Sequence, residues 1–356
     1  MPPGRAQVVE QHSLGGGTGS RPAPVVTGIP PSRSLRLIAA VVIGAALFAL
    51  YLLYTVLHPE AGAGDFDFPL RAARHLVAGR DPYVAMAPGT VGAAGAFLYP
   101  LPAAFVAVPF AALPPAYAGA AFVGVSGALL AFALSARGWW RLLALMSPAF
   151  LLSFSVANWP PLIMASALIP GLGWLAAAKP NLGVVAFAYR PRRSTILAGI
   201  VVIAVSLVLV PGWPAGWLSH VARQEIAHTP TFAWPLGAVG LAGLLRWRTP
   251  EGRALAAFAL VPVSVFPYDH LMLWLIPRNF REALLLTWTA WIAAPAVLGF
   301  NAEASHTTLL LIQAGITLGT VVPATFLVLR HPNTGPVPPR IERLVSCWPH
   351  WARGSA

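Results

Sequence analysis

Residues 37–57 read LIAAVVIGAALFALYLLYTVL, an apolar run that follows closely on Arg33 and Arg36. At about 1.5 Å of rise per residue, a helix of this length crosses the hydrocarbon core of a bilayer. Because arginines are retained on the cytoplasmic face of a membrane, the pair before the run places its start inside and its end outside. The stretch therefore predicts a transmembrane helix with a cytoplasmic N-terminus.

The rest of the chain is also poor in charge. Of the 356 residues, 57% are hydrophobic and 10% are charged, whereas a soluble domain carries about 25% charged residues. Residues 82–136 and 142–178 contain no Asp, Glu, Lys or Arg. We therefore expect an all-α, polytopic integral membrane protein with about eight to eleven spans. Beyond 37–57, spans are predicted near residues 100–114, 116–136, 195–211, 233–247, 254–268, 283–300 and 307–329.

The formal net charge of +12 would indicate a nucleic-acid partner in a soluble protein. Here the arginines cluster in short loops between apolar runs, as at 190–193 and 246–253, which is the pattern of cytoplasmic loops and excludes nucleic-acid binding. The single cysteine, Cys347, excludes an intramolecular disulfide. No histidine spacing typical of zinc sites occurs, so no metal site and no cofactor are predicted. The sequence does not exclude the binding of a divalent metal ion.

Three regions differ in composition. Residues 1–32 are rich in Gly, Pro and Ser and are predicted to form a disordered cytoplasmic leader, and 331–356 a basic cytoplasmic tail. Residues 33–330 form the predicted membrane domain, with a first outer loop at 58–96. Within this domain, 142–178 is interrupted by several Pro and Gly residues. Such broken helices are tolerated at membrane depth where they line a cavity, so this region is predicted to face a site.

The first outer loop carries most of the polar residues of the N-terminal half. Arg71, Arg74 and His75 fall opposite Leu70, Ala73 and Val77 at helical spacing, which predicts an amphipathic helix at the outer surface.

Asp65 and Asp67 precede this helix in the sequence. Both can be read as solvated carboxylates, which are favourable near the N-terminus of a helix. The alternative is that one of them is a general base at the outer membrane surface. Because two such residues diverge at a helix start, only one can be the base.

Several short motifs follow one another along residues 65–277. They are Asp65-Phe66, Ala72-Ala73-Arg74, Gly79-Arg80-Asp81-Pro82-Tyr83, Tyr99-Pro100-Leu101-Pro102, Lys179-Pro180, Val261-Pro262-Val263-Ser264, Asp269-His270-Leu271 and Trp274-Leu275-Ile276-Pro277. In this order they resemble glycosyltransferase family 87, bacterial polyprenol-phosphate-mannose-dependent α-mannosyltransferases. The chain departs from the family at Pro69-Leu70, at Ala157-Asn158, where Gly-Asn or Gly-Gln is usual, and at Asp269-His270, where the family has two histidines.

The resemblance implies a GT-C-type helical bundle in the bacterial cytoplasmic membrane, with its active site on the outer face. It implies inverting transfer of a sugar, most often mannose, from a polyprenyl-phosphate donor to a glycolipid or glycan hydroxyl. Asp65 matches the family's catalytic base, which leaves Asp67 as a spectator or a supporting group. Tyr99 and Asn158 match positions near the substrate.

Four further ionisable residues are candidates for the same site. His270, beside Asp269, is either a buried structural histidine or a group that positions the acceptor or shares its proton. Lys179, the single lysine, either snorkels to an interface or contacts the donor phosphate. Arg223 is a second candidate for a phosphate contact.

Two other functions remain open on the sequence. A transporter or flippase for a lipid-linked or amphipathic solute would share the broken helices and the basic loops. A catalytically degenerate member of the family would account for the departures at Pro69 and Ala157.

Overall fold

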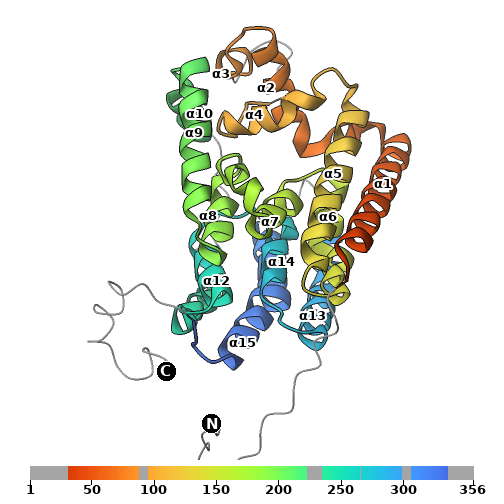
Figure 1. The fold of residues 1–356 in the computed structure, drawn as a ribbon, viewed down its shortest axis with the longest axis vertical. Helices are drawn as coiled ribbons and strands as arrows, with labels where there is room; N and C mark the ends of the chain where they lie inside the picture. Colours follow the sequence, from red (N-terminus) through yellow and green to blue (C-terminus); the bar gives the residue numbers. More distant parts are fainter. Residues whose placement is uncertain (1–30, 88–94, 223–234, 265, 299–305, 336–356) are drawn as a thin grey trace, which may run out of the picture.

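The structure is a computed structural model that describes residues 31–87, 95–222, 235–264, 266–298 and 306–335. Over these ranges the regular structure is entirely helical, with no strand (Figure 1). The predicted all-α class is thereby confirmed. Most of the predicted leader and tail lie outside the described residues, as do Cys347 and Arg223.

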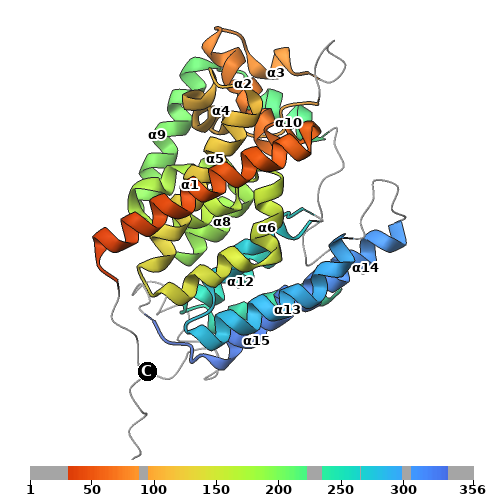
Figure 2. The same ribbon diagram turned by 90° about the vertical axis from the view of Figure 1, so that its right-hand side faces the viewer.

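The first helix, α1 (Arg33–Leu57), contains the apolar run and begins at Ser32, whose hydroxyl accepts a hydrogen bond from the Leu35 amide. It lies alongside α5 (Pro115–Ser135) in both views (Figures 1 and 2). The two backbones approach closely at Gly44: a Cβ built there would lie 2.7 Å from Ala128 Cβ and 2.8 Å from the Gly124 carbonyl oxygen. Small residues at helix crossings of this kind are typical of membrane bundles.

Short helices cover the end of the bundle at which α1 ends (Figure 1). They are η1 (Pro59–Ala61), η2 (Gly64–Phe66), α2 (Asp67–Val77), α3 (Pro82–Ala85), α4 (Pro102–Ala107) and η3 (Val108–Phe110). The predicted amphipathic helix is α2, in which Leu70 and Ala73 are buried. Val77 is exposed, contrary to its expected place on the buried face. Arg74 donates to the carbonyls of Ala111 and Leu113 and so ties α2 to the loop before α5.

The middle of the chain is a series of short, bent helices. They are η4 (Trp139–Met146), α6 (Pro148–Ser155), α7 (Pro160–Leu168), η5 (Pro170–Ala177), α8 (Pro180–Tyr189), α9 (Arg193–Leu209) and α10 (Trp213–Ala222). Helices α6 and α7 meet at a bend of 120°. The interruption of the helical structure that the Pro and Gly residues of 142–178 predict is therefore present.

The remaining helices are η6 (Pro235–Arg246), α12 (Pro250–Leu260), η7 (Pro267–Leu275), α13 (Phe280–Leu298), α14 (His306–Ile316), the π-helical turn η8 (Thr317–Val321) and α15 (Val322–Arg330). Helices α13, α14 and α15 lie together as a layer at one side of the molecule (Figure 2).

By length and composition, three described helical stretches can cross a membrane: Arg33–Leu57, Pro115–Ser135 and Leu310–Arg330. The count rises to five if each of two bent pairs, α6 with α7 and α9 with α10, is one span. Both numbers are below the predicted eight to eleven. Two of the predicted spans are divided: the stretch near 100–114 forms α4 and η3, and in the stretch near 254–268 helix α12 ends at Leu260, before η7 begins. The predicted spans near 233–247 and 283–300 extend beyond the described residues.

Candidate functional site

Asp65 lies in η2, just beyond α1, in a backbone conformation that depends on glycine. Gly64 has a φ of +56°, and a Cβ there would collide with the carbonyl of Val156. This close approach lets the Asp65 amide donate to the Val156 oxygen at 2.7 Å. The outer loop is thereby attached to the end of α6, and the Asp65 side chain is directed toward the bend between α6 and α7.

Phe66 anchors the same turn from the other side. Its ring is fully buried, stacks on Phe122 of α5 with centroids 4.1 Å apart, and meets Phe110 edge-on at 5.5 Å. A buried aromatic ring of this kind contributes a large apolar area to packing. The Asp-Phe pair therefore combines a polar group at the site with an apolar group that holds it in place.

Asn158 occupies the bend itself. The preceding residue, Ala157, has a φ of +45°, the only positive φ of a non-glycine residue in the described part of the chain. Asn158 Nδ2 donates a short hydrogen bond to Asp65 Oδ2. Its Oδ1 accepts from the Trp159 amide at 2.7 Å and from Lys179 Nζ at 3.1 Å. Because Oδ1 faces two donors, the amide group has one orientation and presents its NH₂ to Asp65.

Lys179 connects Asn158 to a second carboxylate. Its Nζ lies 2.8 Å from Asp269 Oδ1, and the other oxygen of Asp269 accepts from the Ser264 amide at 3.0 Å. Lys179 directly precedes α8 and Asp269 lies in η7, so residues 90 positions apart meet here. Both side chains are largely withdrawn from solvent, which favours a paired, hydrogen-bonded arrangement.

Two tyrosines surround this polar network of Asp65, Asn158, Lys179 and Asp269. The Tyr268 ring centroid is 5.4 Å from Lys179 Nζ, within the range of a cation–π contact. The Tyr99 ring lies 5.7 Å from that of Trp159. The network therefore has an aromatic border.

The charges of the network do not balance, because two carboxylates share one ammonium group. Lys179 is in direct contact with Asp269, whereas Asp65 is contacted by the neutral amide of Asn158. Within the described ranges no hydrogen bond to Asp65 Oδ1 is found. Burial raises the pKa of Asp65 above its ordinary value, although the Lys179 charge opposes this shift. Of the two carboxylates, Asp65 is therefore the one available to accept a proton.

The segment that carries Tyr99 is held by hydrogen bonds to three successive carbonyls. The carbonyl oxygen of Tyr99 accepts from the Tyr83 hydroxyl at 2.7 Å, and that of Leu98 from Trp217 Nε1 at 2.9 Å. The carbonyl of Phe97 lies 3.2 Å from His220 Nδ1. Helices α3 and α10 thereby fix the backbone beside the network.

The remaining predicted site residues are not members of the polar network. Asp67 pairs with Arg71 one helical turn away, at 2.8 Å. His270 is buried against the ring of Phe258, with centroids 5.0 Å apart. Within the described part of the chain, its Nδ1 has no hydrogen-bond partner, and no hydrogen bond or ion pair joins its side chain to the network. Arg223 lies outside the described residues.

The structure adds groups that the sequence reading did not assign to the site: the Ser264 and Trp159 amides and the Tyr268 ring. Tyr268 could have been found from its position beside Asp269, but backbone amides leave no sequence signal. Among the residues described, no group of three or more His, Cys, Asp or Glu side chains could hold a metal ion. Comparison of the chain with protein-family models, curated proteins and solved structures finds no match.

Proposed function

We propose that the chain is a membrane glycosyltransferase of the GT-C type that moves a sugar, most often mannose, from a polyprenyl-phosphate donor to a glycolipid or glycan hydroxyl. The observation that carries the proposal is the partly buried carboxylate of Asp65, which is oriented by Asn158 and whose Oδ1 accepts no hydrogen bond from the residues that the structure describes. The sequence resemblance to glycosyltransferase family 87 assigns the same residue as the base.

The proposed reaction is an inverting displacement. The acceptor hydroxyl oxygen attacks the anomeric carbon while the bond from that carbon to the phosphate oxygen breaks. The hydroxyl proton passes to Asp65 Oδ1, and polyprenyl phosphate leaves as the anion. A base with a pKa raised toward neutrality suits this transfer, and burial acts on Asp65 in that direction.

The other members of the network have supporting roles in this proposal. Asn158 fixes the rotamer of Asp65, and Lys179, held by Asp269, supplies the positive charge nearest the departing phosphate. Arg33 and Arg36 at the start of α1 favour a cytoplasmic N-terminus, and Asp65 follows the opposite end of that helix. The proposed site therefore faces the outside of a bacterial cytoplasmic membrane.

A comparison of Asp65→Asn with Asp67→Asn tests the proposal. Labelled sugar transfer is measured in membranes with polyprenyl-phosphate donors carrying mannose, glucose or arabinose. We expect Asp65→Asn to lower the rate by roughly 10²–10⁴-fold, because the proton acceptor is lost. Asp67→Asn is the matched control, since Asp67 pairs with Arg71 and is expected to leave the rate close to that of the wild type.

Equal transfer by wild type and Asp65→Asn would reject Asp65 as the base. Absence of transfer with every donor would reject the enzyme and favour a transporter of lipid-linked solutes. The buried Lys179–Asp269 pair supports that second function, because ionisable pairs inside membrane proteins frequently mark solute pathways.

A further inference from the structure

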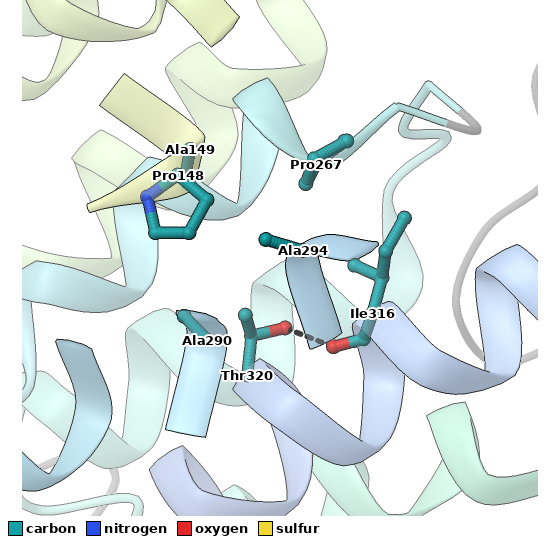
Figure 3. Close-up of a pocket in the computed structure, with 7 residues that line it drawn as sticks. All are labelled: Pro148, Ala149, Pro267, Ala290, Ala294, Ile316 and Thr320. Carbon is teal, nitrogen blue, oxygen red and sulfur yellow. Dashed lines mark hydrogen bonds between the residues drawn. The ribbon is translucent and has the colours of Figure 1, made fainter. Parts of the chain in front are cut away.

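A crevice between α6 and α13 is not used by the reaction as described. It has a volume of about 240 Å³, and we name it the α6–α13 crevice. Its walls include Leu151 and Leu152 of α6, Trp291 and Ala294 of α13, and Pro267 at the start of η7. A smaller hollow shares Pro267 and Ala294 with it and continues toward α14 and η8 (Figure 3).

The lining offers almost nothing to a polar ligand. Among the residues that the structure describes, none that lines either hollow is charged. The Ser155 hydroxyl already donates to the Leu152 carbonyl at 3.0 Å, and the Thr320 hydroxyl donates to the Ile316 carbonyl at 2.6 Å (Figure 3). Trp291 Nε1 donates to the Met146 carbonyl at 2.9 Å. Because an apolar cavity of roughly 150 Å³ stays dry and binds benzene, this larger hollow suits an apolar ligand.

Two of the walls lead directly to the polar network. Ser155 is followed by Val156, whose carbonyl accepts the Asp65 amide, and then by Asn158 two residues further on. Pro267 is followed by Tyr268 and Asp269, which contact Lys179. An amphiphile with its apolar part in the crevice would therefore have its polar end near Asp65, Asn158 and Lys179.

We infer that the α6–α13 crevice seats the isoprenoid chain of the lipid-phosphate donor, next to the phosphate-bearing end at the network. This inference rests on the proposed function. The isoprenoid chain is the occupant that follows from the position of the crevice, because two of its walls lead to the polar network at which the proposed reaction requires the donor phosphate. The inference adds Ala294, Leu152 and Trp291 as residues that select for a long apolar donor.

Ala294→Phe tests this assignment, because Ala294 lines both hollows and is 5% exposed. Ile292→Phe on the same helix is the matched control, since Ile292 is 76% exposed and lines neither hollow. Binding of undecaprenyl phosphate to the full chain in detergent is measured by native mass spectrometry. We expect Ala294→Phe to weaken binding by about tenfold or more, and Ile292→Phe to leave it unchanged. Ala294→Leu, a smaller change, is expected to give an intermediate loss and serves if the Phe variant does not fold.

Two competitors identify the ligand. Geranyl phosphate, with a short chain, is expected to bind weakly and to be insensitive to Ala294→Phe. Phosphatidylglycerol is expected to compete poorly. Binding of undecaprenyl phosphate that Ala294→Phe leaves unchanged would overturn the inference. Displacement by phosphatidylglycerol at equal concentration would also overturn it, because the occupant would then be a bilayer lipid.

The binding assay separates this inference from the proposed function. If undecaprenyl phosphate binds in an Ala294-dependent way but no sugar is transferred, the enzyme proposal fails and the crevice assignment stands. If sugar is transferred from a short-chain donor and Ala294→Phe has no effect on a long-chain donor, the crevice assignment fails and the enzyme proposal stands.

Discussion

At the scale of single residues, the scarcity of charge lets the sequence predict the ionisable members of the polar network. Asp65, Lys179 and Asp269 are three of the few ionisable residues outside the arginine clusters, and the structure brings them together around Asn158. An ionisable group in an apolar chain is costly unless it is paired or functional. Lys179 and Asp269 form an ion pair, whereas Oδ1 of Asp65 has no hydrogen-bond donor among the described residues.

The ionisation of Asp65 leads to a pH prediction. Burial raises its pKa, and the hydrogen bond from Asn158 lowers it. A base works only when deprotonated, so kcat/KM should fall as the pH drops through this raised pKa, above the ordinary range of carboxyl groups. Asn158→Leu removes the opposing hydrogen bond, and we expect the acid limb of the profile to move to higher pH.

The profile is obtained by measuring the rate of sugar transfer in membranes over a range of pH. Asp67→Asn provides the control and should leave the acid limb in place, because Asp67 pairs with Arg71 on α2. An acid limb that stays at the same pH in Asn158→Leu would show that Asp65 is not the titrating base.

The structure separates the surroundings of His270 from those of Asp269. His270 is adjacent to Asp269, and the sequence places both near Asp65, but η7 is a 3₁₀-helix. With three residues per turn, neighbouring side chains leave the helix about 120° apart. Asp269 therefore meets Lys179 while His270 packs against Phe258. Side-chain directions around short 3₁₀ segments are not encoded in hydrophobic periodicity, which is why the sequence could not separate these two residues.

At the scale of elements, the bend between α6 and α7 determines the site. The sequence predicts broken helices from the Pro and Gly residues of 142–178, and the structure has them. The sequence treats Ala157 only as a departure from a Gly-Asn pattern, but its φ of +45° shows that the position requires a glycine-like conformation. That requirement follows from the close approach of η2 to the Val156 carbonyl.

Ala157→Gly is therefore expected to stabilise the protein. A left-handed conformation costs an L-residue about 1–2 kcal/mol, and glycine avoids this cost. Glycine also makes the unfolded chain more flexible, which offsets part of the gain. The net gain in the free energy of unfolding should be roughly 0.5–1 kcal/mol, seen as a higher melting temperature in detergent. Ala165→Gly, in the interior of α7, is the control and should destabilise by about 1 kcal/mol. A lower melting temperature for Ala157→Gly would contradict the strained conformation.

At the scale of the whole molecule, the contact between α1 and α5 connects membrane packing to the site. The sequence predicts both helices correctly as long apolar segments. Within the described residues, fewer stretches are long enough to cross a membrane than the sequence predicts for the whole chain, and some apolar stretches are divided into short helices. Which segments meet is set by small residues whose partners lie far away in the chain. Gly44 and Gly124 are such a pair, and their contact leaves no periodic signal.

Gly44→Leu should separate these two helices. Even the first carbon of the new side chain would lie 2.7 Å from Ala128 Cβ, and overpacking of this kind costs about 1–3 kcal/mol. We expect a lower melting temperature and reduced sugar transfer, since α1 leads into the loop that holds Asp65. Gly199→Leu on α9 is the control, because nothing lies within 4 Å of a Cβ built there. Equal melting temperatures for the two variants would show that the α1–α5 contact does not stabilise the fold.

The four residues of the polar network have a consequence for biosynthesis. They are numbered 65, 158, 179 and 269, so the ribosome makes Asp65 long before its last partner. A nascent chain arrested before η7 would hold Lys179 without its carboxylate, in a segment otherwise free of charge. Such a fragment leaves the Lys179 ammonium with Asp65 as the one carboxylate of the network, so the direct ion pair of the finished chain forms only once Asp269 has been made.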